Sequence, residues 1–257
     1  MIISSSAKKP NVHASAYVAP SAVVSGDVTI EEGCAILHGA VVAAEGAPLA
    51  VGANTVIMEN AVLRSSGGSA MQFPLTVGES CIIGPGAYVV GATIEPGAFI
   101  AAGAKIFNGA TVESGVSVAL GGIVHVNTRI ATGTHVPMGH IAYGDPATVY
   151  TPQDAPKVHA AMNFFEAVFN LPQTDDVREK AANAYSKFLR KAHAQDAIIE
   201  DERRKAGAAK PKSRTEEPPP TQAADVGKVV DIMFVELEEA RLRREAAIER
   251  EKKSKKK

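Results

Sequence analysis

The sequence predicts a left-handed parallel β-helix built from hexapeptide repeats, followed by an α-helical C-terminal extension. Three observations carry this prediction. An aliphatic residue returns at every sixth position, apart from a short insertion at Ala47-Pro48, the break at Arg64–Pro74 and one five-residue step between Val89 and Ile94. Small residues recur four positions after the aliphatic one, and glycine or another turn former often precedes the small residue. A sustained spacing of six fits neither an amphipathic helix, which needs spacings of three and four, nor a simple strand, which needs two.

The aliphatic series sets the extent of the β-helix, which we expect over residues 10–145. Three hexapeptides would close one triangular coil, with the aliphatic residue inside the prism and the small residue in its cramped corner. Each coil would hydrogen-bond to the coils above and below it, so stability is approximately a sum of nearest-neighbour interactions. The series comprises Val12, Val18, Val24, Ile30, Ile36, Val42, Val51, Ile57, Leu63, Val77, Ile83, Val89, Ile94, Ile100, Ile106, Val112, Val118, Val124, Ile130 and Val136.

One interruption of the series is informative. The segment from Arg64 to Pro74 has no aliphatic residue in the hexapeptide register and is rich in glycine and serine. We expect it to leave the prism as a loop. Loops that project from a rigid scaffold often carry functional groups.

Composition restricts the partners and the compartment. Because 27 Lys and Arg oppose 28 Asp and Glu, the net charge of -1 predicts no nucleic-acid partner. Cys34 and Cys81 occupy small-residue positions of the repeat, so we expect small buried side chains rather than a disulfide or a metal pair. No apolar run resembles a signal peptide or a membrane span, which predicts a soluble cytoplasmic protein in a reducing compartment.

The C-terminal part has a different composition. We expect a helical extension over residues 146–205 that packs on or beside the β-helix, with helices at Pro156–Leu171 and from Asp175 into Arg204. Residues 206–226 read as a disordered linker, and residues 227–257 as a charged helix with a lysine tail. That last helix is most simply a solvated one, although its apolar part, Val229–Leu237, could dock on the trimer or on a protein partner.

From Gly39 to Asp145 the chain resembles the γ-class carbonic anhydrase-like family of hexapeptide proteins, within the trimeric LpxA-like superfamily. The likeness is strongest to a bacterial branch with a helical C-terminus and weaker to the β-helical pointed-end subunits of dynactin. The resembling segments include Gly39–Val42, Pro48–Gly52, Ile57–Leu63, Val77–Glu79, Ile82–Gly84, Gly91–Ile94 and Gly144–Ala147.

The resemblance implies a degenerate metal site. In the catalytic members of the family, three histidines bind a divalent metal between neighbouring subunits. The matching positions here are Arg64, Pro85 and Val90, and none of these side chains can ligate zinc. Without a metal that lowers the pKa of its bound water, zinc-hydroxide chemistry is not expected. Glu45 and Glu59 match acidic positions of the family.

The resemblance therefore favours a non-catalytic homotrimeric scaffold that binds no cofactor. The first alternative is a hexapeptide acyltransferase that uses acyl-CoA at the inter-subunit cleft, with a histidine as general base. The second is a divergent hydratase with a metal at a non-family site, for which His125, His135 and His140 are candidates. A cleft around Arg64, Glu59 and Tyr88 could also bind a small anion such as bicarbonate, although Arg64 and Glu59 read more simply as an ion pair between subunits.

Overall fold

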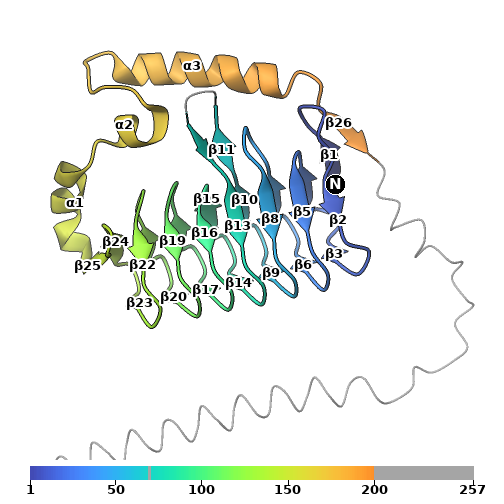
Figure 1. Cartoon of the computed structure of the whole chain (residues 1–257), viewed down its shortest axis with the longest axis horizontal. Helices are drawn as coiled ribbons and strands as arrows, with labels where there is room; N and C mark the ends of the chain where they lie inside the picture. The colour runs from blue at the N-terminus through green and yellow to red at the C-terminus, as the bar shows by residue number, and fades with distance from the viewer. Residues whose placement is uncertain (69–70, 200–257) are drawn as a thin grey trace, which may run out of the picture. The chain divides into compact units, whose positions relative to one another are not determined.

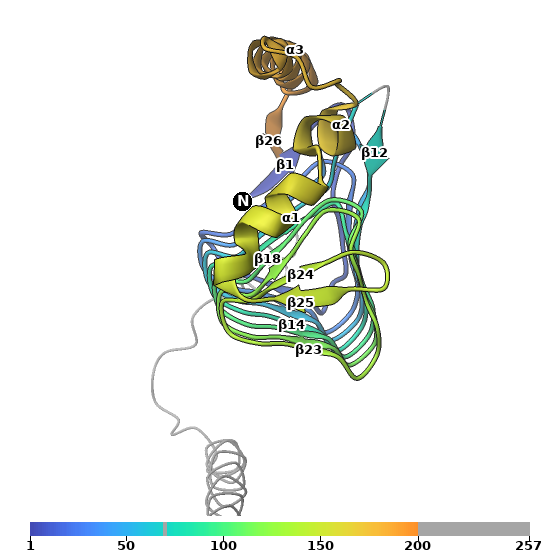
Figure 2. The same ribbon diagram turned by 90° about the vertical axis from the view of Figure 1, so that its left-hand side faces the viewer.

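The computed structural model describes residues 1–68 and 71–199, which form a left-handed parallel β-helix with helices at one side (Figure 1). Three sheets make the walls of a prism that is triangular in cross-section, and their strands pair in parallel except at the two ends of sheet 1 (Figure 2). Sheet 1 contains, in spatial order, β25 (Thr148–Tyr150), β24 (Ile141–Tyr143), β21 (Ile123–Val124), β18 (Lys105–Ile106), β15 (Tyr88–Val90), β10 (Val62–Arg64), β7 (Val41–Ala43), β4 (Val23–Ser25), β1 (Ile2–Ser4) and β26 (Ala197–Ile199).

The other two sheets have seven strands each, taken here in spatial order. Sheet 2 contains β2 (Asn11–Val12), β5 (Val28–Ile30), β8 (Leu49–Val51), β13 (Leu75–Val77), β16 (Thr93–Ile94), β19 (Thr111–Val112) and β22 (Arg129–Ile130). Sheet 3 contains β23 (His135–Val136), β20 (Ser117–Val118), β17 (Phe99–Ile100), β14 (Ile82–Ile83), β9 (Val56–Ile57), β6 (Ala35–Ile36) and β3 (Tyr17–Val18).

The hexapeptide register is confirmed by burial. Every member of the aliphatic series from Val18 to Val136 is buried, and only the first, Val12, is partly exposed. Side chains alternate across a strand, so one aliphatic residue per hexapeptide points into the prism and its neighbours point out. Cys34 and Cys81 are buried, unpaired thiols at corner positions, as expected.

The two ends of the β-helix differ from the expectation. Sheet 1 begins before residue 10, because β1 pairs in parallel with β4, with Ile2 opposite Val24. At the other end, β25 follows β24 as an antiparallel hairpin, so the extension expected to be helical from residue 146 starts with a strand. Pro146 is preceded by a cis peptide bond at the turn between these two strands.

The helices are shorter than predicted. The expected helix Pro156–Leu171 is wrong as a single element: a 3₁₀ turn, η1 (Pro152–Asp154), leads into α1 (Ala155–Ala161), and α2 (Phe164–Phe169) follows separately. The break lies at Asn163, whose side chain accepts a hydrogen bond from the Glu166 N–H and so caps a new helix.

The second predicted helix also ends early. α3 (Val177–Ala192) stops at His193, and the following segment forms β26, antiparallel to β1 with Ile199 opposite Ile2. The pairing buries part of Ile199 against the core of the β-helix. Burial against a distant strand therefore outweighs the local helical pattern after residue 193.

The interrupting segment leaves the prism as a short hairpin rather than an irregular loop. β11 (Ser66–Gly67) pairs antiparallel with β12 (Gln72–Phe73), while Arg64 itself remains in β10 of sheet 1. The hairpin projects toward α3 (Figure 1).

The outward faces of sheets 2 and 3 have opposite character. In each strand, the residue immediately before the inward-pointing aliphatic residue faces outward. In sheet 3 these outward residues lie in one register row: Tyr17, Ala35, Val56, Ile82, Phe99, Ser117 and His135. The matching row of sheet 2 is Asn11, Thr29, Ala50, Thr76, Thr93, Thr111 and Arg129. In Figure 2 sheet 3 (labels β14 and β23) lies on the side of the prism away from α2 and α3.

The linker expected at 206–226 and the charged helix expected at 227–257 lie outside the described residues. Within residues 1–68 and 71–199, no helix is long and apolar enough to cross a membrane.

Candidate functional site

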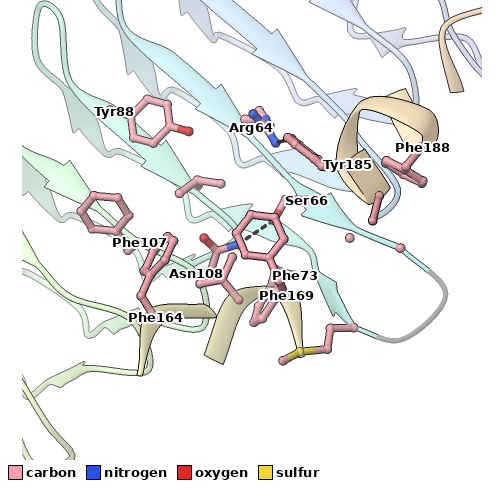
Figure 3. Close-up of a pocket in the computed structure, with 16 residues that line it drawn as sticks. Arg64, Ser66, Phe73, Tyr88, Phe107, Asn108, Phe164, Phe169, Tyr185 and Phe188 are labelled. Carbon is pink, nitrogen blue, oxygen red and sulfur yellow. Dashed lines mark hydrogen bonds between the residues drawn. The ribbon is translucent and has the colours of Figure 1, made fainter. Parts of the chain in front are cut away.

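Arg64 lies at the end of β10, where the chain leaves the prism for the β11–β12 hairpin. In sheet 1 it stands in register between Ala43 of β7 and Val90 of β15. Leu63 points into the core, so alternation turns the Arg64 side chain to the outside of the sheet. The guanidinium therefore faces the helical extension (Figure 3).

The guanidinium is held by an acid and a phenol of the same chain. Its Nε lies 3.2 Å from Oε2 of Glu45, as an ion pair that is not aligned for a hydrogen bond. Its Nη2 donates to the Tyr185 hydroxyl from α3, and the Tyr185 ring centroid lies 5.7 Å from Cζ. The Tyr185 hydroxyl is 3.5 Å from the Glu45 carboxylate. The side chains of Arg64 and Glu45 are 24% and 16% exposed, so the pair is shielded from much of the solvent.

Local structure fixes the acid and the phenol in place. Ser65, which is buried, accepts a hydrogen bond from the Glu45 N–H at 2.9 Å and donates one to the Ala47 carbonyl at 2.5 Å. These bonds tie the Glu45 turn to the base of the hairpin. Burial raises the pKa of the Tyr185 phenol, and Arg64 opposes this rise less strongly, so the hydroxyl stays protonated.

A pocket of about 450 Å³ adjoins this cluster, between the hairpin, sheet 1 and the helices α2 and α3 (Figure 3). Five of the chain's 8 phenylalanines and two of its 5 tyrosines line it, so its surface is rich in aromatic rings. On the floor, Nδ2 of the buried Asn108 donates to Ser66 Oγ at 2.6 Å. The lining residues are Arg64, Ser66, Gly67, Gly68, Met71, Phe73, Tyr88, Val90, Phe107, Asn108, Phe164, Val168, Phe169, Ala184, Tyr185 and Phe188.

The structure brings some of the expected site residues together and separates others. Arg64, Tyr88 and Val90 line the pocket, and Glu45, which is not a lining residue, forms the ion pair with Arg64. Pro85 is exposed in the turn between β14 and β15, at another corner of the prism. Glu59 lies at that same corner one coil away, where its carbonyl accepts from the Gly86 N–H. Within this chain Arg64 therefore pairs with Glu45 and not with Glu59.

The histidines do not form a ligand cluster in the part of the chain that the structure describes. In residues 1–68 and 71–199 no three His, Cys, Asp or Glu side chains are placed so as to hold a metal ion. His125 instead belongs to an aromatic row on sheet 1, with its ring centroid 6.1 Å from Phe107 and 5.6 Å from Tyr143. Burial, with a smaller effect of nearby His159, lowers its pKa.

Arg64, Glu45 and Tyr88 were predicted from the sequence, but the pocket beside them was not. The pocket residues that the sequence did not indicate are the aromatic ones of the helices, Phe73 of the hairpin, and Phe107 and Asn108 on the β-helix. A signal was present, because aromatic residues are concentrated between Phe73 and Phe107 and between Phe164 and Phe188. These two segments meet only in the folded chain, and no local sequence pattern indicates that they do.

Comparison with known proteins supports the resemblance over part of the chain. The chain is 36% identical over 99 residues to γ-carbonic anhydrase 3, mitochondrial, of Arabidopsis thaliana, a match that covers 38% of each protein. It is 36% identical over 103 residues to γ-carbonic anhydrase 1, mitochondrial, of the same plant, covering 39% of this chain and 38% of the relative. The matching segments thus span less than half of these relatives. No family model matches the chain.

Solved structures of hexapeptide transferases are also similar. A hexapeptide transferase family protein from Anaplasma phagocytophilum is 22% identical, with a TM-score of 0.41, and the match covers 71% of this chain and 93% of that one. UDP-N-acetylglucosamine O-acyltransferase from Moraxella catarrhalis is 13% identical, with a TM-score of 0.36 and coverage of 71% and 90%. Over about 100 residues, the sequence of this hexapeptide-repeat β-helix is similar to those of plant γ-carbonic anhydrases.

Proposed function

We propose that this chain is a homotrimeric γ-carbonic anhydrase-like scaffold that does not carry out zinc-hydroxide chemistry. The observation that carries the proposal is the Arg64 side chain, which stands at a position matching a metal ligand and is ion-paired with Glu45. Arginine remains charged at any physiological pH, so it repels a divalent cation as well as failing to ligate it. Tyr185 from α3 covers the same point.

Val90 supports the same conclusion. It is the register neighbour of Arg64 on sheet 1, so two positions that match histidines of the catalytic family lie side by side. The third position, Pro85, lies at a different corner of the prism. A Pro85 could approach Arg64 and Val90 only if it came from a neighbouring subunit. An isopropyl group and a pyrrolidine ring offer no lone pair to a metal, so all three positions lack a donor.

The apolar face of sheet 3 supports assembly with copies of this chain. Tyr17, Ile82 and Phe99 are 50%, 42% and 44% exposed there. With Ala35 and Val56 between them in register, they form one continuous apolar row, and such a patch is typical of an interaction surface. The equivalent row of sheet 2 carries threonines, whose hydroxyls suit a wet surface. An apolar sheet face is stabilised when another protein surface covers it, and a second copy of this chain is the partner that we propose for sheet 3.

Acyl transfer, the alternative enzyme function, lacks a comparable observation. Its general base would be a histidine, and none lines the pocket among the described residues. A thermal-shift titration with acetyl-CoA tests this alternative directly. A saturable stabilisation by acetyl-CoA would favour an acyltransferase over a scaffold.

The assay for the catalytic part of the proposal is CO₂ hydration by stopped flow, with an active zinc carbonic anhydrase as positive control. We expect no acceleration over buffer in the presence of added Zn²⁺ or Co²⁺. Robust turnover by the untagged protein would refute the proposal.

The assay for the assembly part is the mass of the protein in solution by light scattering. The double variant Ile82→Glu with Phe99→Glu places two charges on sheet 3, and Thr76→Glu with Thr93→Glu places two at matched register positions on sheet 2. We expect a trimer for the unmodified protein and the sheet 2 variant, and monomers for the sheet 3 variant. A monomeric unmodified protein, or a trimeric sheet 3 variant, would contradict this interface.

A further inference from the structure

We propose that the pocket between the β-helix and helices α2 and α3 binds a small uncharged apolar molecule, with a ring or short alkyl body and one hydrogen-bonding group. This inference goes beyond the scaffold function, and the described residues that line the pocket all belong to one chain.

The first support is the lining. Phe73, Tyr88 and Phe107 form a wall on the β-helix side, and Phe164, Phe169, Tyr185 and Phe188 form one on the helix side. Small-molecule sites are concave, mainly apolar and roughly 300–1,000 Å³ in volume, and this pocket of about 450 Å³ falls in that range. Aromatic rings on facing walls offer both edges and faces to a flat apolar ligand.

The second support is the charge balance. Among the described residues that line the pocket, Arg64 is the cation, and Glu45 at 3.2 Å compensates its charge. A carboxylate or sulfonate ligand would have to compete with Glu45 for the guanidinium, and it would bring an uncompensated negative charge into an aromatic pocket. The site therefore selects against anions, including bicarbonate, and in favour of uncharged molecules.

The third support is a polar anchor on the pocket floor. Asn108 is 5% exposed and donates one of its amide hydrogens to Ser66 at 2.6 Å. A carboxamide has two donor hydrogens and a carbonyl acceptor, so Asn108 retains hydrogen-bonding capacity beyond the bond to Ser66. A few fixed polar groups in an apolar pocket orient the ligand, which is the role assigned here to Asn108.

Two fluorescent probes with the same ring system test the charge argument. N-phenyl-1-naphthylamine is uncharged, whereas 8-anilinonaphthalene-1-sulfonate adds one negative charge to the same rings. In titrations of the full-length protein we expect saturable binding of the uncharged probe at one molecule per subunit, and at least about tenfold weaker binding of the sulfonate. Equal affinities for the two probes, or no saturable binding of the uncharged one, would overturn the proposal.

Two matched variants on α3 test the location. Ala184 lines the pocket and Ala182, two residues before it, does not, although both lie on the exposed part of the same helix. Ala184→Trp fills the pocket and is expected to weaken the uncharged probe about tenfold or more, while Ala182→Trp leaves it within about twofold. Met71→Trp fills the pocket from the hairpin side and should act like Ala184→Trp.

Circular dichroism establishes that each variant keeps the β-helix, so that loss of binding is not loss of fold. If folded Ala184→Trp and Met71→Trp both bind the probe as tightly as Ala182→Trp, the probe binds elsewhere and the proposal is wrong.

Discussion

Removing the guanidinium of Arg64 is the most informative single change to the site. Arg64→Met keeps an unbranched side chain of similar length in β10 and deletes the positive charge. Glu45 then remains as a carboxylate that is only 16% exposed, with the Tyr185 hydroxyl as its remaining side-chain neighbour at 3.5 Å. A carboxylate that loses its partner in such surroundings is poorly solvated, so the folded state is destabilised.

The magnitude follows from the exposure of the pair. Breaking a fully buried ion pair costs about 3–5 kcal/mol, and an exposed pair contributes about 0–1 kcal/mol. With side chains 24% and 16% exposed, Arg64 and Glu45 lie between these limits, and we expect a loss of about 2 kcal/mol. For a domain of this size that corresponds to a fall in Tm of about 4–8 °C.

A double-mutant cycle separates the ion pair from the packing of the arginine stem. Glu45→Gln removes the charge of the acid alone, and the double variant removes both charges. Neutralising Glu45 should recover about 1 kcal/mol of the loss caused by Arg64→Met, as measured by thermal and denaturant unfolding at pH 7. Strictly additive effects, within about 0.5 kcal/mol, would show that the pair has no energetic coupling and would refute the reasoning.

Two further predictions concern the β-helix. Gly46 has a φ of +75°, and a Cβ there would lie 2.1 Å from the Gly67 carbonyl oxygen, whereas Gly103 has a φ of +66° with open space around it. Gly103→Ala should introduce only backbone strain of about 1–2 kcal/mol, whereas Gly46→Ala adds a clash with the Gly67 carbonyl oxygen and should lower the Tm clearly more. Equal Tm shifts for the two variants would be inconsistent with that clash. Burial and His159 hold the pKa of His125 below its ordinary value near 6.5, so the unfolded chain takes up the proton first. The stability contributed by neutral His125 should be complete above the ordinary pKa and decrease as the pH falls below it. His125→Phe should therefore reduce the fall in Tm between about pH 7 and 5. An unchanged dependence of Tm on pH in this variant would argue that His125 does not cause the fall.

The parts of the fold that repeat were predictable from the sequence, because each hexapeptide places its own aliphatic residue inside the prism. The one five-residue step between Val89 and Ile94 did not disturb this pattern, and both residues are buried. The trimer and the absence of metal chemistry stay predictions.

The parts that depend on distant pairing were not predictable. The apolar pattern of Pro156–Leu171 is helical throughout, but Asn163 caps a second helix within it. β26 forms because Ile199 meets Ile2 at the start of the chain, and no local pattern indicates that partner. The pocket has the same origin, since its two aromatic walls come from segments about a third of the chain apart.

The central claim is that no metal occupies the position marked by Arg64, and elemental mass spectrometry of the untagged oligomer tests it most directly. The protein is prepared without chelators, next to the triple variant Arg64→His, Pro85→His, Val90→His, which places an imidazole at each matching position. We predict no stoichiometric zinc, iron or cobalt in the unmodified protein and a higher metal content in the triple variant. About one metal ion per subunit in the unmodified protein would contradict the account.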